Sequence, residues 1–250
     1  MKTHMYISPH LDDAVWSCGG VIYQQALCGD DVVVVTVCGG DPQESGSSVY
    51  IEQLHKRWGT GQNAVKIRKE EDRAACALLG ARVIHLPIPD AIYRASELGE
   101  YYYPSDEAIF GEVHPLEVGL VDELMQMLEV EWDHASEIYA PAGYGGHVDH
   151  RLTRQAVDRL GKNHCLYRDF PYAFRRGQKP YTPDIPKGKE ILVHLDQNEI
   201  SRWAEAVTTY RSQVSTFWPN PHLVEEELQM FYDMLGGILL TYVAPYRMND

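Results

Sequence analysis

Apolar residues in the first half of the chain alternate between short continuous runs and runs with helical spacing. Residues 32–37 form an unbroken run of mostly β-branched side chains, which is typical of a strand buried on both faces of a parallel sheet. A shorter run at residues 5–8 predicts the preceding strand, and residues 14–27 between them have the spacing of a helix. The same pattern predicts a helix at residues 64–79 and a strand at residues 82–86.

The second half of the chain continues this alternation. Helices are predicted at residues 116–130, 151–160 and 198–211, and strands at residues 137–140, 165–168 and 191–195. Three segments are predicted from their composition to be loops. Residues 41–62 are rich in Gly, Ser and Gln, residues 87–115 contain four prolines, and residues 170–188 are rich in Pro and Arg. The last two are long and contain several prolines, so we expect them to border a functional site. The pattern assigns no element after residue 211.

Alternating strands and helices predict an α/β fold, with a mostly parallel sheet and helices on both of its faces. A length of 250 residues suits one large domain, so residues 1–250 are taken as a single domain. In such sheets, ligands bind beyond the carboxyl ends of the strands. This rule gives each motif below an expected location.

Composition narrows the function classes. Hydrophobic residues make up 44% of the chain and charged residues 23%, as in ordinary globular proteins. The formal net charge of -14 repels phosphate backbones and anionic lipid, which disfavours nucleic acid and membrane surfaces as partners. Five dispersed cysteines suit a reducing compartment. The chain has no run of about 18 apolar residues, the length that membrane insertion requires. We therefore expect a soluble, cytoplasmic protein.

Two motifs follow predicted strands and contain side chains that bind metals. Residues 9–13 read P-H-L-D-D, which places His10 and Asp13 three residues apart with Asp12 beside them. Residues 147–150 read H-V-D-H, and their two histidines are also three residues apart. Two histidines and one carboxylate with an open fourth position form a catalytic zinc site. From the residues alone, His10 and Asp13 join one histidine of the second motif, and the other handles protons or the oxyanion.

This pair of motifs resembles the PIG-L/LmbE family of zinc-dependent deacetylases, whose motifs are of the types P-H-x-D-D and H-x-D-H. The resemblance implies a Rossmann-like fold and a zinc ion bound by His10, Asp13 and His150. It implies Asp12 as the general base and His147 as the residue that stabilises the tetrahedral intermediate. Because His and Asp ligands also accept Fe²⁺ and other divalent ions, zinc is the expected but not the sole compatible metal.

Weaker similarities extend from about Tyr6 to Gln213. Arg68 lies in a segment like the R-x-x-E helix of the family, and Asp90 follows a strand as a family loop aspartate does; the resemblance implies that both bind the sugar. Residues 210–213, Y-R-S-Q, match a Y-x-S-Q segment whose role the sequence does not reveal. Asp149 has two interpretations. It is either a hydrogen-bond partner that orients a ligand histidine or the N-cap of a helix.

We therefore predict a metal-dependent hydrolase that removes an N-acyl group, expected to be acetyl, from a small aminosugar-containing substrate. One alternative is an amidase that cleaves a larger aminosugar or thiol-conjugate amide. The other is a non-catalytic module that binds metal or sugar on the same fold; it would have no need for Asp12. A nucleotide-binding Rossmann protein is disfavoured because the G-x-G-x-x-G fingerprint is absent. The sequence leaves a homo-oligomer open.

Overall fold

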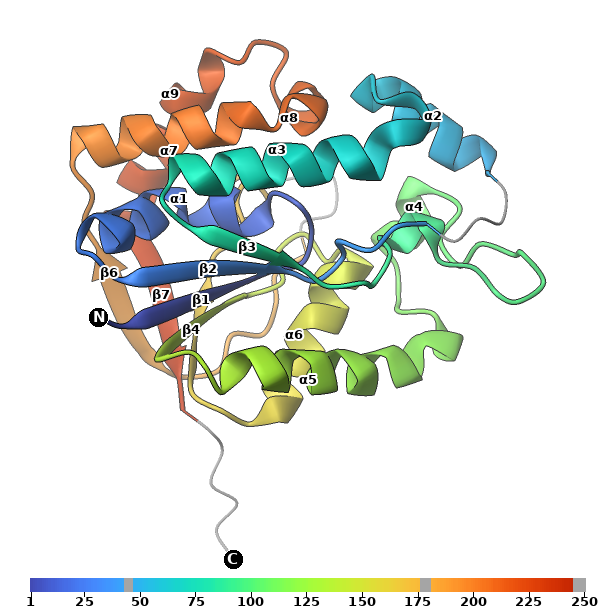
Figure 1. Cartoon of the computed structure of the whole chain (residues 1–250), viewed down its shortest axis with the longest axis horizontal. Coiled ribbons are helices and arrows are strands. Elements are labelled where there is room, and N and C mark those ends of the chain that lie inside the picture. Colours follow the sequence, from blue (N-terminus) through green and yellow to red (C-terminus); the bar gives the residue numbers. More distant parts are fainter. Residues whose placement is uncertain (43–46, 176–180, 245–250) are drawn as a thin grey trace, which may run out of the picture.

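The structure is a computed structural model that describes residues 1–42, 47–175 and 181–244. Its strands and helices alternate along most of the chain (Figure 1). The strands are β1 Thr3–Ser8, β2 Asp31–Thr36, β3 Arg82–His85, β4 Glu137–Pro141, β5 His164–Tyr167, β6 Lys189–Val193 and β7 Ile238–Val243. The α-helices are α1 Asp13–Leu27, α2 Val49–Trp58, α3 Ala64–Leu78, α4 Asp106–Ile109, α5 Val118–Trp132, α6 Val148–Leu160, α7 Gln197–Thr209, α8 Arg211–Phe217 and α9 Leu223–Leu235. Short 3₁₀ turns are η1 Gly61–Asn63, η2 Ala91–Tyr93 and η3 Pro115–Glu117.

The described strands form one sheet in the order β3-β2-β1-β4-β5-β7-β6. The first five strands of the chain pair in parallel, with β1 between β2 and β4. The last strand, β7, pairs antiparallel with both β5 and β6. The predicted mostly parallel sheet is confirmed, and the segment that the pattern left unassigned supplies α9 and the antiparallel strand.

Two hydrophobic cores cover the two faces of the sheet. Because side chains alternate along a strand, Tyr6 of β1 joins one core while Met5 and Ile7 join the other. In β2, the even-numbered valines face the first core and the odd-numbered ones the second. Helices α1, α3 and α7 lie over the first face, and α5 and α6 over the second (Figure 1). Helices on both faces are therefore confirmed.

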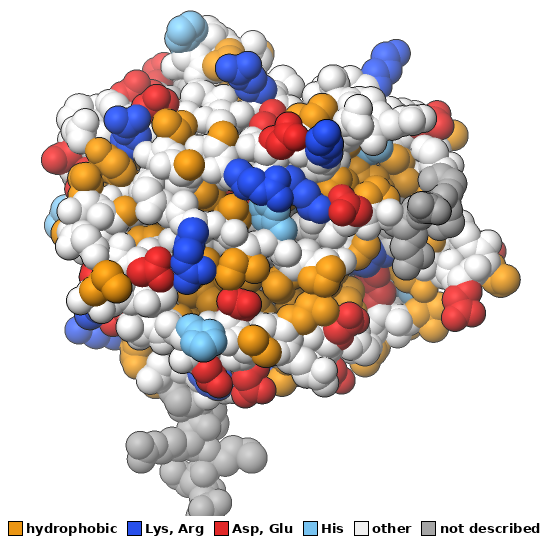
Figure 2. All heavy atoms as spheres, viewed as in Figure 1, with side chains coloured by type: hydrophobic (Ala, Val, Ile, Leu, Met, Phe, Trp, Pro, Cys, Tyr) orange, Lys and Arg blue, Asp and Glu red, His pale blue; other side chains and the backbone are white. Residues whose placement is uncertain are grey.

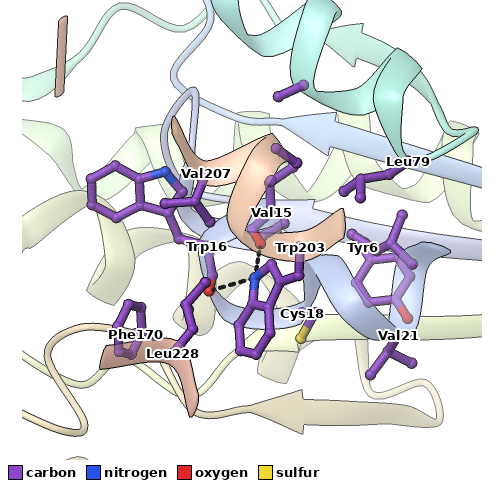
Figure 3. Close-up of a cluster of buried hydrophobic side chains, with 14 of the residues drawn as sticks. Tyr6, Val15, Trp16, Cys18, Val21, Leu79, Phe170, Trp203, Val207 and Leu228 are labelled. Carbon is purple, nitrogen blue, oxygen red and sulfur yellow. Dashed lines mark hydrogen bonds between the residues drawn. The ribbon is translucent and has the colours of Figure 1, made fainter. Parts of the chain in front are cut away.

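Helix α1 is fixed against α7 in its first half. Trp203 of α7 donates its indole N–H to the backbone oxygens of Val15 and Trp16, at 2.8 and 3.2 Å (Figure 3). A side chain at Gly19 would overlap the ring of Trp203, so a glycine is needed for this close approach. The contact holds α1 rigidly, and its first residue, Asp13, belongs to the site described below.

One prediction was wrong. Residues 41–62 were expected to be a loop, but the described part contains helix α2. The Ser48 side chain accepts a hydrogen bond from the backbone N–H of Ile51 and caps the helix start, and Gly59 ends it in a left-handed conformation. Ile51 and Leu54 are buried, and the residues beside them on the same face are partly buried, so the helix is amphipathic and packs one face inward.

Smaller differences concern element ends and the predicted loops. The helix predicted at 198–211 is divided at Tyr210 into α7 and α8, and α6 begins three residues before the predicted start. The loop predicted at 87–115 is largely irregular but includes η2 and α4. Residues 176–180 of the predicted 170–188 loop, and 43–46 of the 41–62 segment, lie outside the described residues.

The surface mixes charges of both signs. On the face shown in Figure 2, Lys and Arg side chains lie beside Asp and Glu side chains, with hydrophobic atoms between them. In the described part of the chain, no helix combines the length and apolar character that crossing a membrane requires.

Candidate active site

The two predicted metal-type motifs meet at the carboxyl edge of the sheet. The first follows β1 directly, and the second follows β4 after a glycine-rich turn. Because β1 and β4 are parallel neighbours, their carboxyl ends lie side by side. Helices α1 and α6 begin within these motifs, so the positive ends of two helix dipoles also face this point.

His10, Asp13 and His150 surround one point. Asp13 Oδ2 lies 3.1 Å from His10 Nδ1 and 3.1 Å from His150 Nε2. All three residues are buried, and their ligand atoms lie within 4.8 Å of one another, as a shared metal ion requires. The structure therefore brings together the ligand set that the family resemblance implies.

His150 has one nitrogen in position to bind a metal. Its Nδ1 lies 2.9 Å from Asp169 Oδ1, which assigns the ring proton to that nitrogen. Its Nε2 has no hydrogen-bond partner among the described residues, since the contact with Asp13 has the distance of an ion pair but not the angle of a hydrogen bond. Burial alone would lower the pKa of His150, but Asp13 and Asp169 raise it to about 9. The two carboxylates thus make the surroundings of His150 negative, which would also stabilise a bound cation in place of the proton.

Sequence reasoning missed Asp169. This residue follows β5, and its Oδ2 accepts hydrogen bonds from the backbone N–H groups of Gly143 and Tyr144, at 2.8 and 3.0 Å. It thereby fixes the turn before the second motif as well as the ring of His150. The signal that could have found it was a carboxylate just beyond a predicted strand, the position that both motifs occupy.

Asp12 is buried beside the cluster but outside the ligand group. Burial and the charge of Asp13 raise its pKa to about 7, and Arg68 partly opposes this shift. Arg68 Nη2 lies 3.8 Å from Asp12 Oδ2. A buried carboxyl with a pKa near neutrality is suited to accept and return a proton.

His147 is held as a neutral imidazole. Its Nδ1 accepts a hydrogen bond from the backbone N–H of Asp149 at 3.2 Å, which leaves the ring proton on Nε2. Burial and neighbouring His10 lower its pKa to about 3. Its ring meets that of His10 edge-on at a centroid distance of 4.6 Å. His147 can therefore donate one hydrogen bond without carrying a charge.

Asp149 orients His10. Its Oδ2 lies 2.9 Å from His10 Nε2 but 3.9 Å from His147 Nδ1. The N-cap of α6 is His147, so the alternative reading of Asp149 as a helix N-cap is wrong. With Nε2 engaged by Asp149, His10 has Nδ1 facing the cluster.

Arg68 and Asp90 lie together in the same cleft. Arg68 Nη1 donates to Asp90 Oδ2 at 3.2 Å, and the Arg68 guanidinium lies 5.1 Å from the ring of Trp58. Asp90 Oδ2 also lies 4.0 Å from His10 Nε2. Arg68 belongs to the second turn of α3 rather than its start. Both residues predicted to bind sugar therefore lie at the cluster, although they are 22 residues apart in sequence.

His10, Asp12, Asp13 and His147 form the floor of a pocket with a volume of about 280 Å³. Its walls come from α2, the α4 region, the segment after β5, and α8, and they include several aromatic residues, namely Trp16, Tyr50, Trp58, Phe110, Tyr172 and Phe217. Tyr50 of α2 donates to Asp106 of α4 at 2.5 Å, which joins two of these walls. The wall supplied by α2 was not predicted, because that helix was not.

The Y-R-S-Q segment joins α8 to α3. Tyr210 donates its hydroxyl to Asp72 Oδ1 at 2.6 Å, and Ser212 donates its N–H and hydroxyl to Glu71, at 2.9 and 2.5 Å. Gln213, the last residue of the segment, lines the pocket. The segment therefore sets the position of one pocket wall relative to the helix that contains Arg68.

Fold and site together define an α/β protein with a candidate hydrolytic metal centre. Residues 5–160 match the sequence model of the family described as PIG-L: GlcNAc-PI de-N-acetylase, so the chain belongs to this family. The resemblance drawn from the two motifs is confirmed.

Individual relatives agree with this assignment. The chain is 28% identical to a 2'-N-acetylparomamine deacetylase of Niallia circulans over 190 residues, which are 68% of each protein. The zinc-inhibited form of a teicoplanin deacetylase has a TM-score of 0.86 and 25% identity, with coverage of 99% of this chain and 100% of that one. A second structure, a deacetylase of the pseudoaglycone of an antimicrobial reagent, has a TM-score of 0.75 and 28% identity, and the match covers 99% of this chain and 98% of that one.

Proposed function

We propose that this protein is a metal-dependent deacylase that removes an N-acyl group, acetyl by preference, from a small aminosugar-containing substrate. The observation that carries the proposal is the grouping of His10, Asp13 and His150 around one point, with the separate buried carboxyl of Asp12 beside them. The proposal is supported by family membership and by relatives named as deacetylases of acetylated paromamine and of teicoplanin.

A divalent ion would be held by His10 Nδ1, Asp13 and His150 Nε2. In that position, it would act as a Lewis acid toward the acyl carbonyl and lower the pKa of a water molecule. Zinc is the expected ion because two histidines and one carboxylate suit it. Since one relative is described in a zinc-inhibited form, Fe²⁺ and other divalent ions belong in any activity test.

Asp12 is the proposed general base. Its carboxyl accepts the proton of the attacking water and returns it to the nitrogen that leaves as an amine. Its burial and its pKa of about 7 suit both steps near neutral pH. The guanidinium of Arg68, 3.8 Å away, restricts the orientation of the carboxyl.

His147 is the proposed donor to the developing oxyanion. The hydrogen bond from Asp149 N fixes its tautomer, so Nε2–H is available to the carbonyl oxygen as negative charge grows there. Because burial and the neighbouring His10 lower the pKa of His147 to about 3, the donor would be the neutral imidazole rather than the imidazolium.

Arg68 and Asp90 are proposed to bind the sugar. Paired with each other at 3.2 Å, they present donors and an acceptor at one side of the floor, where ring hydroxyls can replace part of their mutual contact. Binding the ring there would place the amide over the floor of the pocket and supply the orientation on which rate depends.

A direct test uses metal-stripped protein reloaded with Zn²⁺, Fe²⁺ or Co²⁺ and a panel of N-acetylated aminosugars, their glycosides and larger N-acyl amides. We expect amine release that requires metal and is abolished by chelation. Release from the larger amides alone would favour the amidase alternative. Metal binding without amine release from any member of the panel would favour a non-catalytic module.

Other assignments rest on the sequence. The single domain over residues 1–250, the cytoplasmic location, the homo-oligomer that the sequence left open, and the absence of nucleic-acid partners stay predictions. Analytical ultracentrifugation of the purified chain would settle the oligomeric state.

A further inference from the structure

A buried arginine lies behind the histidine–aspartate pair at the floor. Arg94, in the segment after η2, donates Nη1 to Asp149 Oδ1 at 2.6 Å. The other oxygen of Asp149 faces His10 Nε2 at 2.9 Å and accepts from the backbone N–H of Ala91 at 3.0 Å. One carboxylate oxygen of Asp149 therefore contacts His10, and the other accepts a hydrogen bond from Arg94.

Arg94 is itself fixed on its far side. Its Nε and Nη2 donate to the two oxygens of Glu117, at 2.5 and 3.2 Å, and its Nη1 also donates to the backbone oxygen of Pro89 at 3.0 Å. Tyr103 donates its hydroxyl to Glu117 at 2.5 Å and lies under the guanidinium, 5.4 Å from ring centre to Cζ. Arg94 is only 8% exposed and Glu117 only 4%. A planar guanidinium held on two edges can transmit orientation, which a lysine in its place could not.

This chain of contacts has a consequence for His10. A buried carboxylate that loses one partner destabilises the folded protein, and its side chain rotates toward the donors that remain. Without Arg94, Asp149 would lose its charged donor at Oδ1, and the carboxylate would be held less firmly against His10 Nε2. The ring of His10 would then be free to rotate its Nδ1 away from Asp13.

We propose that Arg94 is a positioning residue for the metal centre, which fixes Asp149 against His10, and that Glu117 fixes Arg94 in turn. This inference rests on the proposed metal site. The predicted 87–115 loop, which we expected only to border the site, would then also help to hold the floor of the pocket in place. Arg94 touches neither the proposed ligand atoms nor the pocket, so its effect must pass through Asp149.

The test compares Arg94→Met with Arg154→Met. Arg154 is a matched control, because it is 9% exposed and bound to a carboxylate, Asp158, but contacts neither Asp149 nor His10. Metal-stripped proteins are titrated with Co²⁺, whose visible absorption reports ligand geometry, and with Zn²⁺ against a chelating dye. For Arg94→Met we expect a Kd weakened by about 10- to 100-fold, the usual cost of losing an outer partner of a ligand, and an altered Co²⁺ spectrum. Arg154→Met should bind both ions as the wild type does.

Equal Kd values and spectra for Arg94→Met and the wild type would overturn the inference while leaving the metal site intact. Failure of the wild type to bind either ion would overturn the proposed metal centre and this inference with it. If Arg94→Met does not fold, Glu117→Gln keeps the shape of the side chain and removes its charge. We expect Glu117→Gln to weaken metal binding in the same direction, and a wild-type Kd in that variant would contradict the inference.

Discussion

The floor and the rim of the pocket are built in different ways. The floor consists of His10, Asp12, Asp13 and His147, which belong to two short motifs at the ends of adjacent parallel strands; His150, fully buried, contacts Asp13 behind it. The rim consists of α2, the α4 region, residues 171–172 and α8, which come from four separate parts of the chain.

The difference follows from what holds each part. Floor residues are nearly all buried and tied to rigid elements, since strand ends and helix starts fix their backbone. Rim residues lie on separate helices that side-chain contacts hold in place, such as Tyr50 with Asp106 and Ser212 with Glu71. We therefore expect substitutions in the floor to stop the chemistry, and substitutions in the rim to change which substrate is accepted.

The largest effect should come from Asp12. In Asp12→Asn the proposed base is lost, so kcat should fall by about 10²- to 10⁴-fold, the usual contribution of general acid–base catalysis. Metal content should not change, because Asp12 is outside the ligand group. Asp106→Asn, a rim carboxylate in the same pocket, is the control and should lose far less activity. Equal losses in both variants would remove the distinction between floor and rim.

Arg68 lies between the two regions, and its loss should act through substrate binding. Hydrogen bonds to charged groups contribute about 1.5–3 kcal/mol, so Arg68→Met should lower kcat/KM by roughly 10- to 100-fold. Lys69→Met, one residue further along α3, is the control because its side chain pairs with the exposed Asp41. Metal occupancy, measured by elemental analysis, should equal that of the wild type. A normal kcat/KM in Arg68→Met would exclude it from sugar binding.

Phe110 tests the rim itself. It is 45% exposed, and its ring stands edge-on to His147 at a centroid distance of 5.5 Å. Phe110→Ala should change the ranking of substrates that differ in the group attached to the sugar, with metal content unaltered. Leu98→Ala is the control, because Leu98 is exposed in the same segment but does not line the pocket. An identical substrate ranking for Phe110→Ala and the wild type would contradict a rim that selects substrates.

The smallest effect concerns the stability of α2. Ser48→Ala removes the N-cap, which contributes about 1 kcal/mol, or roughly a fivefold change in local opening. Hydrogen exchange in α2 should therefore accelerate by about that factor, while the metal Kd stays the same. Ser47→Ala is the control, since Ser47 does not cap the helix. Unchanged exchange in Ser48→Ala would mean that packing alone defines this helix.

The same contrast explains what could be predicted from the sequence. The floor was predictable because the proposed ligands and their neighbours lie within two short motifs and because parallel strands bring their carboxyl ends to one edge. The buried run of β2 and the helical spacing of α1 also carry local signals, and their predicted limits differ from the observed ones by one residue at most.

Most of the features that the sequence did not predict depend on contacts between distant parts of the chain. Helix α2 does have local signals, an amphipathic spacing and a cap residue at each end, but it is only ten residues long and lies in a segment rich in Gly, Ser and Gln, so the composition favoured a loop. Asp169 contacts His150 across 19 residues, and Arg94 contacts Asp149 across 55. A charged side chain in an irregular segment gives no sign of such a partner until the fold is known. Asp149 was ambiguous for the same reason, because its partner, His10, is 139 residues away.

The central claim is that His150, and not His147, completes the metal centre, a choice that the motif spacing alone left open. Both residues are buried histidines in one motif, so His150→Ala and His147→Ala are matched variants. Each is metal-stripped, mixed with one equivalent of Zn²⁺ and analysed for bound metal after gel filtration. We predict that His147→Ala retains the metal and that His150→Ala loses it. Full metal occupancy in His150→Ala, or loss of metal from His147→Ala alone, would contradict the account.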